Sequence, residues 1–142
     1  MFYIHQIRTI QTAKYLAENN NIEINIMSNL GERKFGIDSW NQLPENFERK
    51  QILDENYKIG TGENQKEVRN RMYFAIIKIL NENKNKRITI VSHATAISFL
   101  IKKWCDIEII NNKLRYSFKN NILLEGHIEY CAGFKLEFAE DN

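Results

Sequence analysis

The sequence contains no apolar run of the roughly 18 to 20 residues that a membrane-spanning helix requires. Its first residues, MFYIHQIRTIQ, lack both the positive region and the long apolar region of a secretory signal peptide. The formal net charge is only +2, and lysines and arginines are spread along the chain rather than gathered into a patch. We therefore expect a cytoplasmic protein with no membrane and no nucleic acid among its partners.

Cysteine is scarce as well. Cys105 and Cys131 are far apart, and the sequence has no CxxC motif or His/Cys cluster, which excludes a zinc site and a disulfide framework. We expect both cysteines to be buried thiols. A chain of 142 residues with 43% hydrophobic content is long enough for one core and too short for two, so we expect a single domain over residues 1–142.

Apolar periodicity predicts three helices and several short strands. The helices are expected over 7–18, around 68–80 and over 95–104, with a short helix over 44–53; strands are expected over 22–27 and 87–92 and in the tail segments NNILLEGHIEY and GFKLEF. An ordered excursion over 28–47 and a loop over 54–64 complete the chain. This order predicts an α/β domain with a mostly parallel sheet, although no strand is predicted before the first helix.

Three polar residues are candidates for binding or chemistry, and of these His93 lies where such a sheet usually binds ligands, beyond the carboxyl end of a strand. His93 follows the strand 87–92 and begins a helix, Glu32 follows the strand 22–27, and Arg8 lies in the first turn of the first predicted helix. Each residue could also have no functional role. His93 could be a hydrogen-bonded polar residue at a strand end, Glu32 a surface carboxylate and Arg8 a solvated cation. His5 and His127 have no partner in the local sequence, and we assign them no role.

Four segments, taken in order, resemble the histidine phosphatase superfamily, also called phosphoglycerate mutase-like. They are RTIQTA (8–13), LGERKFG (30–36), GTGENQKEVRNRM (60–72) and ITIVSHATAISFLI (88–101). The resemblance implies a three-layer α/β/α sandwich that lacks the family's first strand and helix. It spans roughly residues 3–105.

The resemblance also implies roles for three residues. Arg8 corresponds to an arginine that grips the phosphoryl group, and His93 to the second active-site histidine, which hydrogen-bonds the phosphoryl oxygens. Glu32 corresponds to the acid that protonates the leaving alcohol and later helps to activate water. The implied partner is a small phosphorylated molecule or inorganic phosphate, bound without a metal or other cofactor, because arginines and histidines supply the positive field. Selectivity would come from the excursion around Trp40 and the loop near Tyr57.

The family's Arg-His-Gly motif, whose histidine becomes phosphorylated, is absent from this sequence. Without its nucleophile, covalent catalysis cannot proceed. Ala94 replaces the glycine that usually follows the second histidine, a change that a negative φ tolerates. We therefore expect a phosphomonoesterase domain that is impaired or inactive. The alternatives are a non-catalytic phosphate-binding or regulatory module and a folded gene fragment.

A missing interior strand would leave unpaired backbone edges on its neighbours, and such edges favour pairing with another chain. A homodimer with altered strand pairing, or a marginally stable monomer, is therefore expected. Light scattering that shows a stable, cooperative monomer would count against this expectation.

The segment IHQI stands where the family usually has Ser-Pro before the arginine. With the codons ATT CAC CAA for Ile-His-Gln, a shifted frame reads TCA CCA, which encodes Ser-Pro. We therefore expect a frameshift or an internal start within a longer phosphatase gene. Translation of the DNA upstream of Met1 in all frames should reveal Arg-His-Gly, and its absence there would contradict this explanation.

Overall fold

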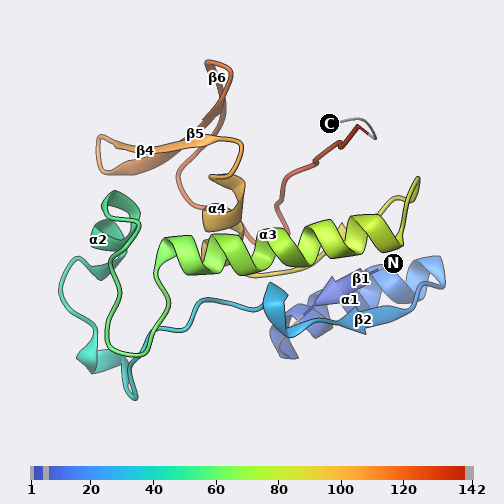
Figure 1. The fold of residues 1–142 in the computed structure, drawn as a ribbon, viewed down its shortest axis with the longest axis horizontal. Helices are drawn as coiled ribbons and strands as arrows, with labels where there is room; N and C mark the ends of the chain where they lie inside the picture. The colour runs from blue at the N-terminus through green and yellow to red at the C-terminus, as the bar shows by residue number, and fades with distance from the viewer. Residues whose placement is uncertain (1, 5–6, 140–142) are drawn as a thin grey trace.

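The computed structural model describes residues 2–4 and 7–139. Its main elements, in chain order, are β1 (Phe2–Ile4), α1 (Ile7–Asn20), β2 (Ile24–Ile26), α2 (Phe47–Leu53), α3 (Gln65–Glu82), β3 (Thr89–Ile90), α4 (Ala94–Ile101), β4 (Asp106–Ile110), β5 (Lys113–Phe118) and β6 (Asn121–Glu125) (Figure 1). Two short 3₁₀ helices, Ser28–Leu30 and Trp40–Gln42, lie in the segment between β2 and α2.

A parallel three-stranded sheet, in the order β2-β1-β3, forms the centre of the α/β layers. Ile4 pairs with Ile26 on one side of β1, and Tyr3 pairs with Ile90 on the other. The strand β1 was missing from the sequence-based prediction, in which the chain began with a helix. Because the three strands are parallel, the segments that follow them leave from the same edge of the sheet.

Helices cover both faces of this sheet. On one face, Ala13 and Ala17 of α1 pack with Ile24 and Val91. On the other face, the core of α3 and α4 packs with Ile90, the residue just before Val91. Successive strand residues point to opposite faces, so Ile90 and Val91 contribute to opposite layers. The predicted three-layer α/β/α arrangement is confirmed, with α3 running across the molecule in Figure 1.

The remaining strands form a separate antiparallel sheet in the order β4-β5-β6, beside the predicted parallel sheet. Two-residue turns join these strands at Asn111-Asn112 and at Lys119-Asn120, with φ values of 50°, 59°, 48° and 65°. Positive φ at both central residues is typical of the tight turns that match strand twist. This sheet packs on the end of α4 through the buried Tyr116.

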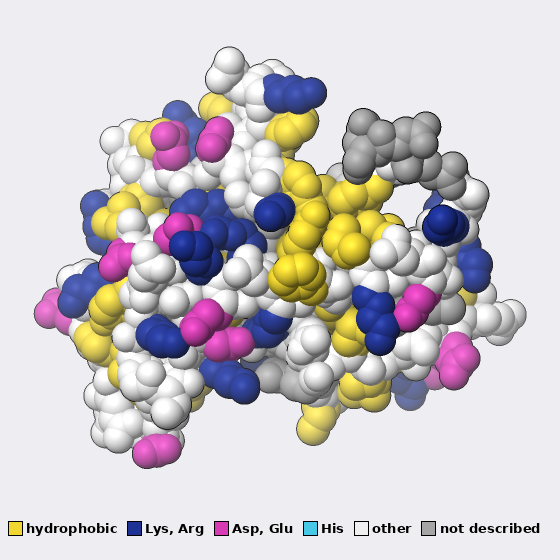
Figure 2. Space-filling model, viewed as in Figure 1, with side chains coloured by type: hydrophobic (Ala, Val, Ile, Leu, Met, Phe, Trp, Pro, Cys, Tyr) yellow, Lys and Arg dark blue, Asp and Glu magenta, His cyan; other side chains and the backbone are white. Residues whose placement is uncertain are grey.

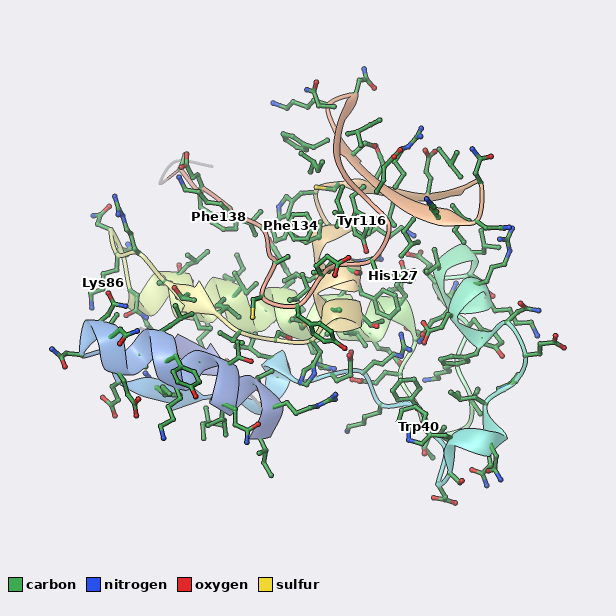
Figure 3. All side chains as sticks on the ribbon, turned by 180° about the vertical axis from the view of Figure 1, so that it is seen from behind. Trp40, Lys86, Tyr116, His127, Phe134 and Phe138 are labelled. Carbon is green, nitrogen blue, oxygen red and sulfur yellow. The ribbon has the colours of Figure 1, made fainter. Side chains whose placement is uncertain are left out.

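The tail follows β6 back along the molecule without forming the strand predicted for GFKLEF. Its aromatic rings instead pack against earlier elements (Figure 3). The ring centroids of Phe134 and Tyr116 are 5.9 Å apart, and those of Phe138 and Trp104 are 5.8 Å apart. Cys131 is exposed in this tail, which corrects the expectation of a buried thiol, whereas Cys105 is buried as expected.

Two helix boundaries also differ from the prediction. The helix expected from Pro44 begins only at Phe47, because Asn46 takes a left-handed conformation with φ of 60°. The helix expected to run to Trp104 ends at Ile101 and continues as turns. Within the described residues, no helix is both long enough and apolar enough to cross a bilayer.

A close approach of two loops makes Gly36 indispensable. Gly36 has φ of +76°, and a Cβ there would lie 2.1 Å from the carbonyl oxygen of Ile59. Beside it, the Glu63 N–H donates to the Lys34 carbonyl oxygen at 2.8 Å. No rearrangement confined to a side chain can relieve a clash with backbone.

We predict that Gly36→Ala lowers the free energy of unfolding by about 2 to 4 kcal/mol in urea titrations. The control is Gly133→Ala, where a Cβ meets nothing within 4 Å; its effect should stay under about 0.5 kcal/mol. Equal effects of the two substitutions would show that the loops do not pack in this way.

Candidate functional site

Two hydrogen bonds bring the Glu32 loop to the first turn of α4. The Ser92 hydroxyl donates to the Leu30 carbonyl oxygen at 2.6 Å, which ties the end of β3 to the loop after β2. The Ala96 N–H donates to Oε1 of Glu32 at 3.1 Å. The carboxylate of Glu32 therefore lies at the N-terminal end of α4, directly beside His93, which is the N-cap residue of this helix.

His93 is held at the junction of β3 and α4. It is 8% exposed, its backbone is extended with φ of −108°, and its carbonyl oxygen accepts the Ile97 N–H at 2.8 Å. The first turn of a helix carries unpaired N–H groups and the positive end of the helix dipole, so anions bind there readily. The local structure thus suits a phosphoryl group next to His93.

Arg8 lies on the first turn of α1, where the Thr12 hydroxyl donates to its carbonyl oxygen at 3.2 Å. Its side chain is exposed. Arg8, Glu32 and His93 follow β1, β2 and β3, three neighbouring parallel strands, and so lie at one edge of the sheet. Of the three residues, Glu32 is bonded to the first turn of α4, His93 is the N-cap residue of that helix, and Arg8 is exposed on the first turn of α1.

Arg71 lies in the segment 60–72, and no role was predicted for it from the sequence. Its guanidinium binds Glu63 through two bonds, Nε to Oε1 at 2.7 Å and Nη2 to Oε2 at 3.0 Å. It also donates to the carbonyl oxygens of Asn29 at 2.8 Å, Gly31 at 3.1 Å and Glu32 at 3.0 Å. Arg71 therefore fixes the backbone of the loop that presents Glu32.

Glu63 is held in its charged form by this contact. Burial tends to raise its pKa, but the hydrogen bond from Arg71 and the one from the Lys34 N–H outweigh burial, and the pKa lies below its ordinary value of 4.5. The Lys34 N–H reaches Oε2 of Glu63 at 2.9 Å. One carboxylate thus joins α3 to the segment that follows Glu32.

Arg33, the residue after Glu32, is a second residue that sequence reasoning missed. Its guanidinium binds the carboxylate of Glu48. The Cζ atom of Arg33 also lies over three aromatic rings, at 4.3, 5.3 and 5.8 Å from the ring centroids of Phe35, Phe47 and Phe99. The residue is 4% exposed, and its Nε and Nη1 have no hydrogen-bond partner among the described residues. A buried positive charge therefore lies directly beneath the segment that carries Glu32.

A cavity of about 880 Å³ opens beside the first turn of α4. Ala94 and Thr95 contribute to its wall, together with residues of α2, of β4 and β5 and of the segment after β6. His127, left without a role by the sequence, also lines it, and Figure 3 shows His127 and Tyr116 beside α4. The cavity is thus a neighbour of the Glu32 and His93 site rather than the site itself. The ranges 2–4 and 7–139 contain no group of three or more His, Cys, Asp or Glu side chains suited to a metal ion.

We predict that Arg71→Lys lowers the free energy of unfolding by about 2 kcal/mol, because an ammonium group cannot span Glu63 and the loop carbonyls together. The control is Arg115→Lys, which alters the exposed pair of Arg115 with Glu125 and should cost under about 0.5 kcal/mol. Equal losses in chemical denaturation would contradict the anchoring role.

The pKa of Glu63 also predicts a pH dependence. A carboxyl whose pKa is lowered by folding stabilises the protein above its unfolded pKa, and this contribution is lost as the pH falls through the folded value. The stability difference between wild type and Glu63→Gln should therefore be largest at neutral pH and shrink below pH 4.5. A difference that stays constant down to acidic pH, measured by urea denaturation, would exclude this contribution.

Comparison with known proteins agrees with the geometry. The model of the histidine phosphatase superfamily (branch 1) matches residues 5–122. No curated protein sequence matches the chain. Among solved structures, a mycobacterial glucosyl-3-phosphoglycerate phosphatase in complex with VO3 superimposes with a TM-score of 0.62 at 16% identity, covering 72% of this chain and 56% of that chain. The same values apply to its complex with inorganic phosphate.

Another solved structure, described as mycobacterial hydrolase 2, covers 96% of this chain and 71% of its own, with a TM-score of 0.64 at 12% identity. Likeness at such low identity shows the fold. The chain spans little more than half the length of the mycobacterial phosphatase that it matches. Because the family model covers most of the sequence, this chain belongs to the histidine phosphatase superfamily.

Proposed function

We propose that this chain binds the phosphoryl group of a small phosphomonoester, or inorganic phosphate, at the sheet edge that carries Arg8, Glu32 and His93. The observation that carries the proposal is the 3.1 Å bond from the Ala96 N–H to Glu32, which holds this carboxylate at the first turn of α4, the helix whose N-cap residue is His93. The bound phosphate of the mycobacterial phosphatase supports this ligand class.

The chemistry of the three residues suits phosphoryl transfer, which depends on positioning and on charge complementary to the equatorial oxygens. His93 would donate a hydrogen bond to these oxygens, and the guanidinium of Arg8 would neutralise their charge from the adjacent turn. Glu32 would protonate the leaving alcohol. The bonds of Arg71 to the backbone of the Glu32 loop would keep that carboxyl in place.

Turnover needs a nucleophile in line with the leaving group. The chain has three histidines. His93 serves as a ligand in this proposal, His127 lies on the neighbouring cavity, and His5 lies outside the described residues. The proposed activity is therefore phosphate binding with impaired hydrolysis. The homodimer and the cytoplasmic location expected from the sequence stay predictions.

We predict that inorganic phosphate binds to the wild-type chain in calorimetric titration and that His93→Ala and Arg8→Ala each weaken binding about tenfold, since each removes a charge-assisted contact. The control is Lys14→Ala, which removes an exposed cation from the same helix as Arg8. Weakening by the Lys14 substitution to the same extent would point to general electrostatic attraction and against this site.

We predict no sustained hydrolysis of p-nitrophenyl phosphate by the wild-type chain. The contrary result would be steady turnover that His93→Ala abolishes and His5→Ala leaves intact. That outcome would mean that the chain catalyses hydrolysis without the Arg-His-Gly histidine.

A further inference from the structure

The cavity beside α4 is next to the proposed phosphoryl site. Ala94 and Thr95 line it, and they directly follow His93 along the chain. The next turn of α4 contributes Ser98, which accepts a hydrogen bond from the Tyr116 hydroxyl at 2.6 Å while donating to the Ala94 carbonyl oxygen at 2.8 Å. A group attached to a phosphate at His93 would therefore enter this cavity.

The inner walls of the cavity are largely apolar. Phe99 of α4 and Ile52 of α2 form one side, and Ile107, Ile109 and Leu114 of the antiparallel sheet form the other. A cavity of about 880 Å³ is within the range that accepts an organic molecule larger than a small sugar acid. Its walls favour burial of a hydrocarbon or aromatic group.

The charges around the cavity are unbalanced. Both acidic residues of its lining are engaged elsewhere, Glu48 with Arg33 and Glu125 with Arg115 at 2.7 Å. The cations of the lining are Arg49, Lys102 and Lys113. Arg49 has a 3.4 Å contact with Asn112, Lys102 lies close enough to Glu55 to help lower the pKa of that carboxyl, and Lys113 forms no ion pair with any other described residue.

Figure 2 shows lysine and arginine side chains gathered beside α2 and the antiparallel sheet, next to hydrophobic surface. The buried Arg33 is paired with Glu48, so this pair adds no net charge to the rim. Apolar walls with three cations in the lining complement a ligand whose organic body is apolar and ends in an anion.

We propose that this cavity is the subsite for the organic part of the ligand, and that this part is an apolar group bearing a carboxylate or a second phosphate, recognised by Lys102 and Lys113. The inference rests on the proposed function, since the phosphoryl group at His93 aligns the ligand. It narrows the substrate class from phosphomonoesters in general to amphipathic ones with two anionic ends.

The test is calorimetric titration of the full chain with inorganic phosphate, methyl phosphate, phenyl phosphate and 4-carboxyphenyl phosphate. Phenyl phosphate should bind more tightly than methyl phosphate, and 4-carboxyphenyl phosphate about tenfold more tightly than phenyl phosphate. The double substitution of Lys102→Gln with Lys113→Gln should abolish the gain from the carboxylate and leave phosphate binding unchanged. Lys103→Gln is the matched control, because Lys103 contacts the Tyr73 ring and does not line the cavity.

The possible failures are distinguishable. If inorganic phosphate and all three esters fail to bind, the proposed function is wrong and the subsite falls with it. If phosphate and methyl phosphate bind but the phenyl and carboxyl groups add nothing, the phosphoryl site stands and the subsite is wrong. A carboxylate gain that survives the double substitution, or that Lys103→Gln also removes, likewise overturns the role of Lys102 and Lys113.

Discussion

The side chain of Arg71 is the contact on which the rest of the site depends. Its guanidinium faces the carboxylate of Glu63 on one side and the carbonyl oxygens of Asn29, Gly31 and Glu32 on the other. The loop after β2 contains only one turn of 3₁₀ helix, Ser28–Leu30, and the carbonyl oxygens of Asn29, Gly31 and Glu32 find their partner in Arg71. The planar fork of arginine satisfies several of these acceptors at once, which lysine cannot do. Arg71 therefore ties the loop that presents Glu32 to the long helix α3.

The same scaffold extends from the phosphoryl site to the cavity. The backbone carbonyl of Glu63 accepts a hydrogen bond from the buried Gln51 of α2 at 3.2 Å, and Gln65 donates to the Gln51 carbonyl at 3.1 Å. The wall that α2 contributes to the cavity is thus tied to the residue that pairs with Arg71. On the far side, the bond between Ser98 and Tyr116 ties α4 to the antiparallel sheet. Loss of the Arg71 contact would consequently disturb both the site and its neighbour.

Sequence reasoning recovered the parts of the fold that rest on local pattern. The long helix α3 follows from the apolar periodicity around residues 68–80, and it appears in the structure over Gln65–Glu82. The strand β1 was missed because three residues carry no readable period, and its place at the sheet centre is set by pairing with β2 and β3. The strands β4 and β5 were missed because their turns use Asn111-Asn112 and Lys119-Asn120 instead of the Asn-Gly pairs that signal a hairpin.

Sequence reasoning likewise recovered only part of the candidate site. The order of Arg8, Glu32 and His93 along the chain was readable, and parallel topology brings them to one sheet edge. The roles of Arg71 and Arg33 were not readable, because their partners lie far away in sequence and only the fold brings them together. The cavity is likewise built from α2, α4 and an antiparallel sheet whose association no local motif encodes.

We expect phosphate to bind at the first turn of α4, where Glu32 is held and His93 is the N-cap residue. The most direct test is a titration of the isotope-labelled chain with inorganic phosphate, followed by NMR of the backbone amides and the histidine rings. The account predicts shifts concentrated at His93 and over residues 94–96 and 30–33, with the His127 ring unaffected. Shifts centred on His127 with residues 93–96 unchanged, or no shifts at all at saturating phosphate, would contradict it.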